Sequence, residues 1–505
     1  MSSASIQLLI DRRAEETPDE VFLIGPDQGR SVTYLQLQKS CLAMGGVLQE
    51  HGIGVGDTVA YAMRNGCDAA QVILGLMYHG CLATAVNLVS GANTISYVFS
   101  HSGARLVFCQ DDTLSLLQEA CDPGAMPVMV NMDRQSFDAF ELFDKAEPVA
   151  SDADGLLMYT SGTTGVPKGV VLTHRNLIAG GENAQLAHQL TALDRGLCVL
   201  PLYHINGLCV TLMGALVSGG SLIMPGRFSV KVFWDQLADH GGTWFSVVPT
   251  QISYLLHEAE NATPQRLASL RFGRSASAPL SPDVQRAFED KFNVPIIETM
   301  GLTETAAQIL SNPIDGVRKI GSPGIAYGNE VIIADERQNE LPRGEEGEVC
   351  VRGPNVMRLY RANEEATAQT ITPAGWLRTG DLGRMDEDGY VFITGRLKEL
   401  IIKGGENIAP REVDEALYSH PDVVEAAAFA RPCPRYGQRV EAGVMLAEGS
   451  GVTQQQLIEL CHERLGPFKS PDVIYFYPEL PKGPSGKIQR LKLAELAEQT
   501  IQEAS

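Results

Sequence analysis

The chain has 505 residues, of which 44% are hydrophobic and 20% charged, and its formal net charge is −21. At roughly 150 residues per domain, this length predicts about two to four compact units, and the composition excludes general disorder. The acidic balance argues against nucleic-acid binding and against binding to anionic membranes, because both need basic surfaces. A small anionic ligand needs only local positive groups and stays possible.

The cysteines and the N-terminus indicate a cytoplasmic protein. The 10 cysteines form no CxxC pair and have no zinc-like spacing with histidine, which is typical of reduced, buried cysteines. Near the N-terminus, Asp11, Glu15 and Glu16 come too early for a signal peptide. The apolar run at 208–217 is only about half as long as the roughly 20 residues of a membrane span, so we expect a buried helix there.

The first part of the chain alternates short apolar runs with helix-length segments, as expected for an α/β fold with buried strands. We predict strands at the apolar runs 58–62, 106–109, 128–131, 197–200 and 221–224. We predict helices at the segments 33–50 and 233–240.

From about residue 317 to 396 the pattern changes to short runs punctuated by glycine, which predicts antiparallel β structure resembling a barrel. Beyond this part, helices and strands alternate again. The predicted elements of the two parts are 330–334, 348–352 and 390–394, and then 410–419, 423–430, 443–446 and 453–465. We therefore predict an N-terminal domain, 1–397, and a small C-terminal domain, 398–505.

The strongest chemical signal is residues 159–170, Tyr-Thr-Ser-Gly-Thr-Thr-Gly-Val-Pro-Lys-Gly-Val, between two apolar runs. Glycines let backbone N–H groups approach an anion, hydroxyls donate hydrogen bonds, and lysine adds a point charge. A phosphate-binding loop is predicted, and a plain polar hairpin loop is the alternative. It is not a Walker A loop, because GxxxxGK[ST] occurs nowhere. Its predicted phosphate-binding residues are Thr160, Ser161, Gly162, Thr163, Thr164, Gly165 and Lys168.

This loop resembles the phosphate-loop signature of the adenylate-forming superfamily, which includes acyl-CoA synthetases, peptide-synthetase adenylation domains and firefly luciferases. The resemblance covers essentially the whole chain, because further family motifs follow in order. They are PLYH (201–204), SASAPL (275–280), MGLTE (300–304), GWLRTGD (375–381), GRLKE (395–399), GGENI (404–408) and PKGPSGK (481–487). The resemblance implies an α/β fold with layered sheets and a β-barrel-like part in the large domain, and a small, mobile C-terminal lid.

The resemblance also implies a reaction in two steps: a carboxylic acid and ATP form an acyl-adenylate, and a thiol then takes the acyl group. Lys487 is expected to bridge the carboxylate and the α-phosphate, where negative charge concentrates in the transition state. Lys168 and its loop would hold the departing pyrophosphate, Thr303 would contact the α-phosphate, and Glu304 would anchor Mg²⁺. The alternatives are a surface lysine at 487 and a helix cap at 303–304.

For the nucleoside, the resemblance assigns the ribose hydroxyls to Asp381, assisted by Arg396. The adenine side would be formed by Ser277, Ala278, Pro279, Met300 and Gly301. Met300 departs from the family pattern, which usually has tyrosine there, although methionine still offers a polarizable apolar surface. At 275–278, the sequence Ser-Ala-Ser-Ala stands where the family more usually has a Gly-Gly version. We expect this difference to narrow the floor of the pocket that binds adenine.

Coenzyme A is the expected acceptor, because no carrier domain follows Lys487, and Lys398 would be the hinge of the lid. His204, Arg274 and Ser275 are expected to border the acyl pocket, and such polar groups suit a short, polar acid better than an alkyl chain. Segments around 226–250, 271–275 and 347–356 are similar to the oxalate–CoA ligase branch. Oxalate or another short dicarboxylate is thus the predicted substrate.

Several alternatives remain open at this stage. A medium-chain fatty acid or an aryl acid is the second substrate class, and Arg274 could instead form a structural ion pair that points away from the pocket. A luciferase would need an imported aryl substrate. A non-catalytic nucleotide-binding regulator would have lost Lys487, Glu304 or Asp381, yet all three are present. We expect a monomer or a homodimer.

Overall fold

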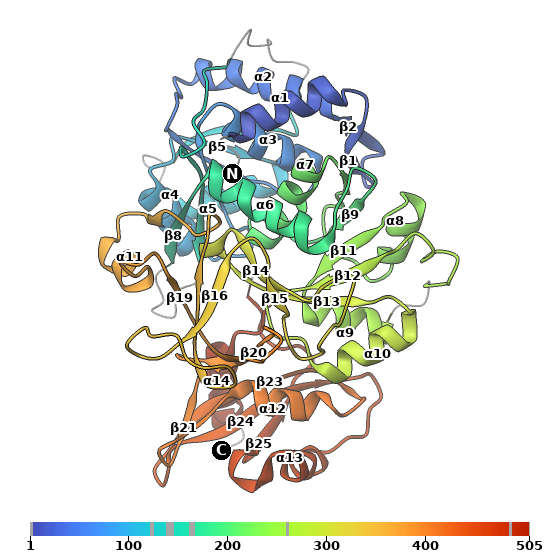
Figure 1. Ribbon diagram of the computed structural model, residues 1–505, viewed down its shortest axis with the longest axis vertical. Coiled ribbons are helices and arrows are strands. Elements are labelled where there is room, and N and C mark those ends of the chain that lie inside the picture. Colours follow the sequence, from blue (N-terminus) through green and yellow to red (C-terminus); the bar gives the residue numbers. More distant parts are fainter. Residues whose placement is uncertain are drawn as a thin grey trace.

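The computed structural model describes residues 4–121, 126–137, 146–160, 167–258, 262–483 and 487–503. The predicted phosphate-binding residues Ser161, Gly162, Thr163, Thr164 and Gly165 lie outside these ranges. Two parts are visible in Figure 1: a large N-terminal part and a smaller C-terminal part below it, coloured orange to red. The α/β class predicted from the sequence is confirmed by the sheets described next.

A seven-stranded mixed sheet forms the first layer of the N-terminal part. In sheet order its strands are β18 (Leu359–Tyr360), β8 (Lys168–Thr173), β7 (Asp154–Thr160), β4 (Leu82–Ala85), β3 (Thr58–Ala62), β5 (Leu106–Cys109) and β6 (Val128–Asn131). β7 and β8 are antiparallel, and Thr160 pairs with Lys168. In the sequence, the predicted phosphate loop therefore comes between two neighbouring, hydrogen-bonded strands of this sheet.

A nine-stranded sheet forms the second layer. Its strands are, in order, β15 (Ile325–Ala326), β14 (Ala307–Ser311), β13 (Ile296–Leu302), β12 (Phe272–Ser275), β11 (Trp244–Val247), β9 (Arg195–Cys198), β10 (Ser221–Ile223), β1 (Val21–Gly25) and β2 (Arg30–Thr33). The strand predicted at 197–200 is β9, shifted toward the N-terminus. Pro201 has no N–H for a ladder, so the chain leaves the sheet before it.

Helices cover both sheets. They are α1 (Ile6–Glu16), α2 (Tyr34–Glu50), α3 (Cys67–Tyr78), α4 (Ala92–Ser102), α5 (Leu114–Ala120), α6 (His174–His188), α7 (Gly214–Ser218), α8 (Phe233–Asp239), α9 (Pro249–Glu258), α10 (Pro282–Phe292) and α11 (Glu364–Thr370), with a π-helix at Asn206–Met213. Helix α2 starts where its pattern predicts, because Thr33 and Gln36 form a capping box. In the described ranges, no helix is both long and apolar enough to cross a membrane.

Apolar side chains of the two sheets share one core, which includes Phe108 and Leu156 from the first sheet and Leu222 and Phe272 from the second. A separate aromatic cluster packs α8 and α10 against the second sheet. The glycine-rich stretch then forms a four-stranded antiparallel sheet. Its strands are β16 (Glu330–Ala334), β17 (Glu346–Arg352), β19 (Leu377–Met385) and β20 (Val391–Arg396).

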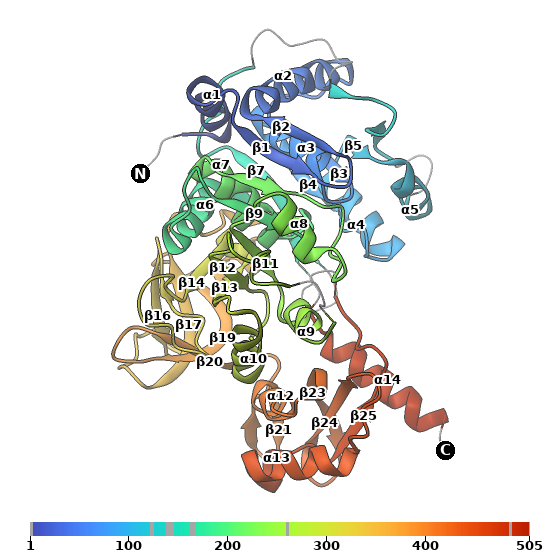
Figure 2. The ribbon, with the colours of Figure 1, turned by 90° about the vertical axis from the view of Figure 1, so that its right-hand side faces the viewer.

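The C-terminal part has its own sheet and core. Its elements are β21 (Ile401–Lys403), β22 (Glu406–Ile408), α12 (Pro410–Tyr418), β23 (Val423–Cys433), β24 (Gly437–Leu446), α13 (Gln454–Lys469), β25 (Val473–Phe476) and α14 (Arg490–Glu503). In Figure 2, α9 and α10 of the N-terminal part face α12 and β23, and these elements are in contact. The domain boundary at 397/398 and the mobility of the C-terminal part stay predictions.

Candidate active site

A cleft lies where the two parts meet, and it contains many of the residues predicted from the sequence. From the N-terminal part it is lined by Ser277, Ala278, Pro279, Met300, Gly301, Asp381 and Arg396, and from the C-terminal part by Lys487. These residues come from the ends of β12 and β13, from β19 and β20, and from the loop before α14. Parts of the chain more than 200 residues apart thus converge on one site.

The backbone of Ser277 marks the floor of this cleft. Its φ angle is 74°, in the left-handed region that a non-glycine residue rarely occupies. Such strain persists only where the surroundings impose it, and it concentrates at ligand sites. Nearby, a Cβ atom at Gly301 would come within 1.8 Å of the Ala307 carbonyl oxygen, so only glycine fits there. Both features shape the side of the cleft predicted to bind adenine.

Asp381 and Arg396 face each other across β19 and β20, where they are register partners. The Nε atom of Arg396 donates a hydrogen bond of 2.6 Å to Oδ1 of Asp381. Burial alone would lower the pKa of Arg396, but the Asp381 carboxylate outweighs burial and raises it. The ion pair holds the carboxylate at the edge of the cleft, as a ribose-binding aspartate requires.

The side chain of Lys487 lies among other charged side chains. Its Nζ atom lies 3.9 Å from Oε1 of Glu399, and Arg490 lies 3.5 Å from the other oxygen of that carboxylate. Burial, and then the nearby positive charge of Arg396, lower the pKa of Lys487. Glu399 and Arg490 were not assigned by the sequence analysis, although Glu399 ends the GRLKE motif.

Lys168 and Tyr360 are among the residues that line a second pocket. The Nζ atom of Lys168 stands 4.7 Å from the centroid of the Tyr360 ring, and the Tyr360 hydroxyl donates to Oε1 of Glu304 at 2.7 Å. Tyr360 therefore joins the lysine after the phosphate loop to the predicted magnesium ligand. It lies outside every motif, so the sequence offered no signal for it.

Thr303 and Glu304 belong to a short 3₁₀ turn, Thr303–Thr305, which follows β13 directly. The hydroxyl of Thr305, not that of Thr303, accepts the hydrogen bond from the backbone N–H of Leu302. The proposed helix-cap role is thus filled by Thr305. Lys398 lies in the turn after β20, between the cleft residues Arg396 and Glu399.

Arg274, on β12, is buried, with 1% of its surface exposed. One guanidinium nitrogen donates to Oδ1 of Asn206 at 2.8 Å and to the Ser246 hydroxyl at 3.1 Å. Among the residues that the structure describes, no carboxylate forms an ion pair with Arg274. Burial lowers the pKa of Arg274 to about 9.

This buried arginine is linked to the cleft through Asn206, whose amide nitrogen lies 3.5 Å from the Ser277 hydroxyl. Ser275, next to Arg274, has a buried hydroxyl with no hydrogen-bond partner within the described ranges. His204 lies two residues before Asn206, and the centroid of its ring is 5.1 Å from that of Tyr203. Asn206 comes from the π-helix, a conformation frequent at functional sites, which sequence patterns do not predict.

The donor set suits the predicted nucleotide and metal. The cleft offers the Asp381 carboxylate, an apolar methionine and a lysine, which are groups that suit a nucleoside phosphate. In the described part of the chain, no three His, Cys, Asp or Glu side chains could hold a metal ion together. Mg²⁺ readily binds through one carboxylate and phosphate oxygens, so Glu304 with a bound nucleotide is sufficient.

Comparisons with known proteins agree with this geometry. Residues 10–361 match the AMP-binding enzyme family, and residues 412–487 match the AMP-binding enzyme C-terminal domain. The chain is 46% identical over 497 residues to the sulfoacetate–CoA ligase of Cupriavidus necator, covering 97% of both chains. It is 34% identical over 468 residues to the oxalate–CoA ligase of Arabidopsis thaliana, covering 89% of this chain and 90% of the relative.

Among solved structures, ATP-bound MatB from Rhodopseudomonas palustris superimposes with a TM-score of 0.89 at 29% identity, covering 98% of this chain and 99% of that one. The chain therefore belongs to the AMP-binding enzyme family, within the adenylate-forming superfamily. More particularly, it is an AMP-forming acid–CoA ligase, which couples a carboxylic acid to coenzyme A at the expense of ATP.

Proposed function

We propose that the enzyme activates a short acid with a second anionic group, and that oxalate, other short dicarboxylates and sulfoacetate are the first candidates. One observation carries this proposal: Arg274 is buried, and no carboxylate in the described ranges pairs with it. Burying an unpaired cation is costly, and an anionic group of a substrate would offset that cost. The relatives named as sulfoacetate–CoA and oxalate–CoA ligases support the same class.

The surroundings of Arg274 favour such a substrate over a fatty or aryl acid. Asn206 and Ser246 fix one guanidinium nitrogen, while its Nε atom has no hydrogen-bond partner among the described residues. An alkyl chain or an aromatic ring placed against this group would leave the buried cation without compensation. A carboxylate or sulfonate would accept charge-assisted hydrogen bonds from it. His204 and Ser275 complete the proposed acyl pocket.

The nucleotide roles form the second part of the proposal. Asp381, held by Arg396, accepts the ribose hydroxyls. Adenine lies against Ser277, Ala278, Pro279, Met300 and Gly301. Lys487 approaches the α-phosphate and the carboxylate of the acid, and Thr303 contacts the same phosphate.

Pyrophosphate is held by Thr160, by Lys168 and by Ser161, Gly162, Thr163, Thr164 and Gly165 of the phosphate loop. Mg²⁺ bound at Glu304 neutralises phosphate charge. Coenzyme A takes the acyl group after the C-terminal part has turned about Lys398. The 10 cysteines are free, which supports a cytoplasmic location, and we expect a monomer or a homodimer.

A panel of acids, assayed for CoA-dependent AMP release, tests the substrate class. Oxalate, malonate and sulfoacetate should give higher kcat/KM than acetate, octanoate or benzoate. The variant Arg274→Met keeps the volume and removes the charge. It should lower kcat/KM for the dianionic acids by about 10²-fold, because hydrogen bonds to charged groups each contribute roughly 1.5–3 kcal/mol. Acetate should lose far less.

The matched control is Arg286→Met, because Arg286 is exposed and pairs with Asp283 on the same helix, α10. This variant should leave the selectivity unchanged. The proposal is wrong if octanoate or benzoate exceeds every short dianionic acid by about tenfold in kcat/KM, roughly 1.4 kcal/mol of transition-state preference. Equal losses for acetate and oxalate in Arg274→Met would assign Arg274 to folding.

A further inference from the structure

Helix α9 of the N-terminal part is joined to strand β23 of the C-terminal part by two consecutive side chains. The Ser253 hydroxyl donates to the Val424 carbonyl oxygen at 2.7 Å. The hydroxyl of the next residue, Tyr254, donates to Oε1 of Glu425 at 2.8 Å. Both bonds cross between the two parts, so any rotation of the C-terminal part must break them.

Lys482 also contacts Glu425, the residue that accepts the hydrogen bond from Tyr254. Its Nζ atom lies 3.1 Å from the same Oε1 atom of Glu425 and 5.5 Å from the centroid of the Tyr254 ring. The Glu425 side chain is fully buried, and both partners contact the same carboxylate oxygen. Burial would lower the pKa of Lys482, but Tyr254 and Glu425 together raise it. The lysine is therefore held as a cation at the junction.

The same lysine lies at the base of the loop that carries Lys487. Lys482 forms an isolated β-bridge with Ile488, and the N–H of Gly483 donates to the Lys487 carbonyl oxygen at 2.7 Å. On the other side, α9 begins at Pro249, which lines the cleft. A continuous set of contacts thus runs from the cleft wall through Tyr254, Glu425 and Lys482 to Lys487.

We propose that Tyr254 and Lys482, joined at Glu425, are positioning residues that hold Lys487 in the cleft during acyl-adenylate formation and separate before thioester formation. This inference rests on the proposed function of Lys487. According to this inference, the contact of Tyr254 and Lys482 with Glu425 serves only one half-reaction. The contact stabilises the orientation seen here and opposes the rotation of the C-terminal part.

The variant Tyr254→Phe tests the proposal, because it removes only the hydroxyl and keeps the ring. Single-turnover formation of acyl-adenylate from acid and ATP should slow by about tenfold, since a hydrogen bond to a buried carboxylate is lost. Thioester formation from supplied acyl-adenylate and CoA should be unchanged or faster. Glu425→Gln, which removes the charge that Lys482 contacts, should show the same split.

Tyr475→Phe is the matched control. Tyr475 also donates to a buried glutamate, Glu441, at 3.1 Å, but both residues lie within the C-terminal part. This variant should change neither half-reaction selectively. Comparable losses in both half-reactions for Tyr254→Phe, or the same split in Tyr475→Phe, would overturn the proposal.

A second measurement does not depend on catalysis. Amide hydrogen exchange of the ligand-free protein should become faster in α9 and β23 in Tyr254→Phe and stay unchanged there in Tyr475→Phe. If no acid supports AMP release, the proposed function fails, and this exchange experiment still decides whether Tyr254 joins the two parts. Unchanged exchange in Tyr254→Phe would refute the contact itself.

Discussion

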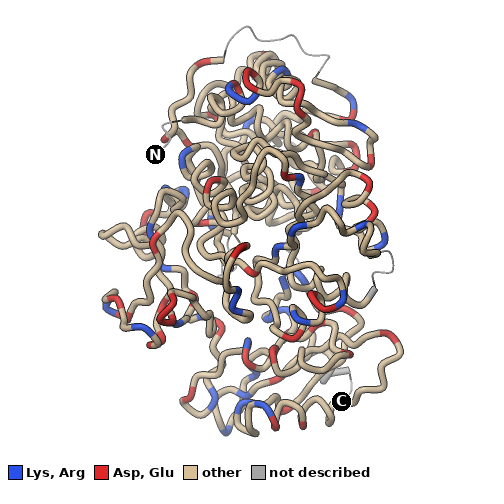
Figure 3. The backbone as a smooth tube through the Cα atoms, turned by 45° about the vertical axis from the view of Figure 1, so that its right-hand side comes forward, with Lys and Arg blue, Asp and Glu red and all other residues tan. Residues whose placement is uncertain are grey.

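Lys487 is the residue for which we predict a role in only one half of the two-step reaction. It reaches the cleft from a loop of the C-terminal part, and its only ion-pair partner among the described residues, Glu399, is 3.9 Å away. At that distance the ammonium group is not held in a close pair, so it stays available to a phosphate oxygen. Figure 3 shows that acidic and basic residues are mixed over both parts. The positive charge at the cleft therefore comes from individual side chains.

We predict that Lys487→Ala slows acyl-adenylate formation by about 10²–10³-fold, because removing one preorganised transition-state donor costs roughly 2.7–4 kcal/mol. Thioester formation from supplied acyl-adenylate should change far less. The measurement is a pair of single-turnover rates, one from acid with ATP and one from acyl-adenylate with CoA. Comparable losses in both would show that Lys487 serves folding or docking of the C-terminal part.

The pH dependence of the wild type provides an independent control. Burial lowers the pKa of Lys487, and the group is charged only below that pKa. The rate of acyl-adenylate formation should therefore fall as pH rises through a value below the usual lysine pKa of about 10.4. The thioester step should lack this alkaline decline. A decline shared by both steps would point to another group.

At the scale of elements, several short strands were predicted best. The runs at 58–62, 106–109, 128–131 and 330–334 match β3, β5, β6 and β16 residue for residue. When polar turns flank a short apolar segment, the first and last residues of the strand are clear from the sequence. Where a boundary depends on a partner strand, prediction failed: β24 starts at Gly437, six residues before the predicted 443, because β23 pairs along its whole length.

The residues of the candidate site also fall into two groups, those that the sequence predicted and those that it did not. Residues within contiguous motifs, such as Asp381 and Lys487, were predicted through the family resemblance that the set of motifs carries. Asn206, Ser246 and Tyr360 were missed, because each acts through a side chain from a distant segment. Only the folded chain shows that Arg274 meets Asn206 and Ser246. Tertiary contacts of this kind leave no periodic or local signal in a single sequence.

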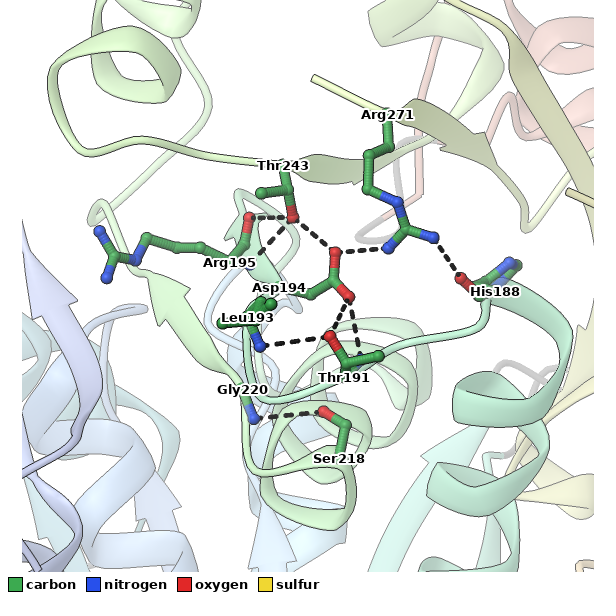
Figure 4. Close-up of polar contacts among 9 residues, drawn as sticks. All are labelled: His188, Thr191, Leu193, Asp194, Arg195, Ser218, Gly220, Thr243 and Arg271. Carbon is green, nitrogen blue, oxygen red and sulfur yellow. Dashed lines mark hydrogen bonds and ion pairs between the residues drawn. The ribbon is translucent and has the colours of Figure 1, made fainter. Parts of the chain in front are cut away.

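The turn before β9 depends on a buried carboxylate, Asp194 (Figure 4). Its Oδ2 accepts the backbone N–H of Thr191 at 2.9 Å, and its Oδ1 accepts the Thr243 hydroxyl at 2.9 Å and pairs with Arg271. These bonds fix the start of β9, and thereby the direction in which the chain continues to His204. Sequence patterning gave no sign of this network.

We predict that Asp194→Ala lowers the free energy of unfolding by about 3 kcal/mol, because it leaves Arg271 and three hydrogen-bond donors of Thr191 and Thr243 without their buried acceptor. Chemical denaturation monitored by tryptophan fluorescence measures the change, since Trp244 lies next to Thr243. Glu330→Ala, which breaks the exposed pair with Arg352, is the control and should have a far smaller effect. Equal effects would contradict a structural role for the buried network.

At the scale of the whole molecule, the proposed two-step reaction predicts that the C-terminal part presents a different surface to the cleft in each step. Lys487 occupies the cleft in the orientation seen here, and a thiol needs access after the acyl-adenylate has formed. The two parts are in contact through α9 and β23 and through α10 and α12, and the boundary predicted between them falls in the turn at 397–399. A rotation about that turn would exchange one surface for the other without unfolding either core.

We predict that Lys398→Pro spares one half-reaction and damages the other. Proline fixes φ near −65°, so a residue that has to change its backbone angles during the rotation can adopt only one of the two states. Separate single-turnover rates for acyl-adenylate and thioester formation measure the effect. The damaged step identifies the orientation whose φ value proline cannot adopt.

Lys398→Ala separates the backbone from the side chain in this experiment. It removes the ammonium group but leaves φ free, so both half-reactions should keep rates close to those of the wild type. If Lys398→Ala reproduces the loss seen with proline, the side chain matters and the pivot is elsewhere. If the proline variant folds normally but loses both half-reactions equally, residue 398 does not separate the two orientations, and the rotation must be distributed over β20, β21 and the turn between them.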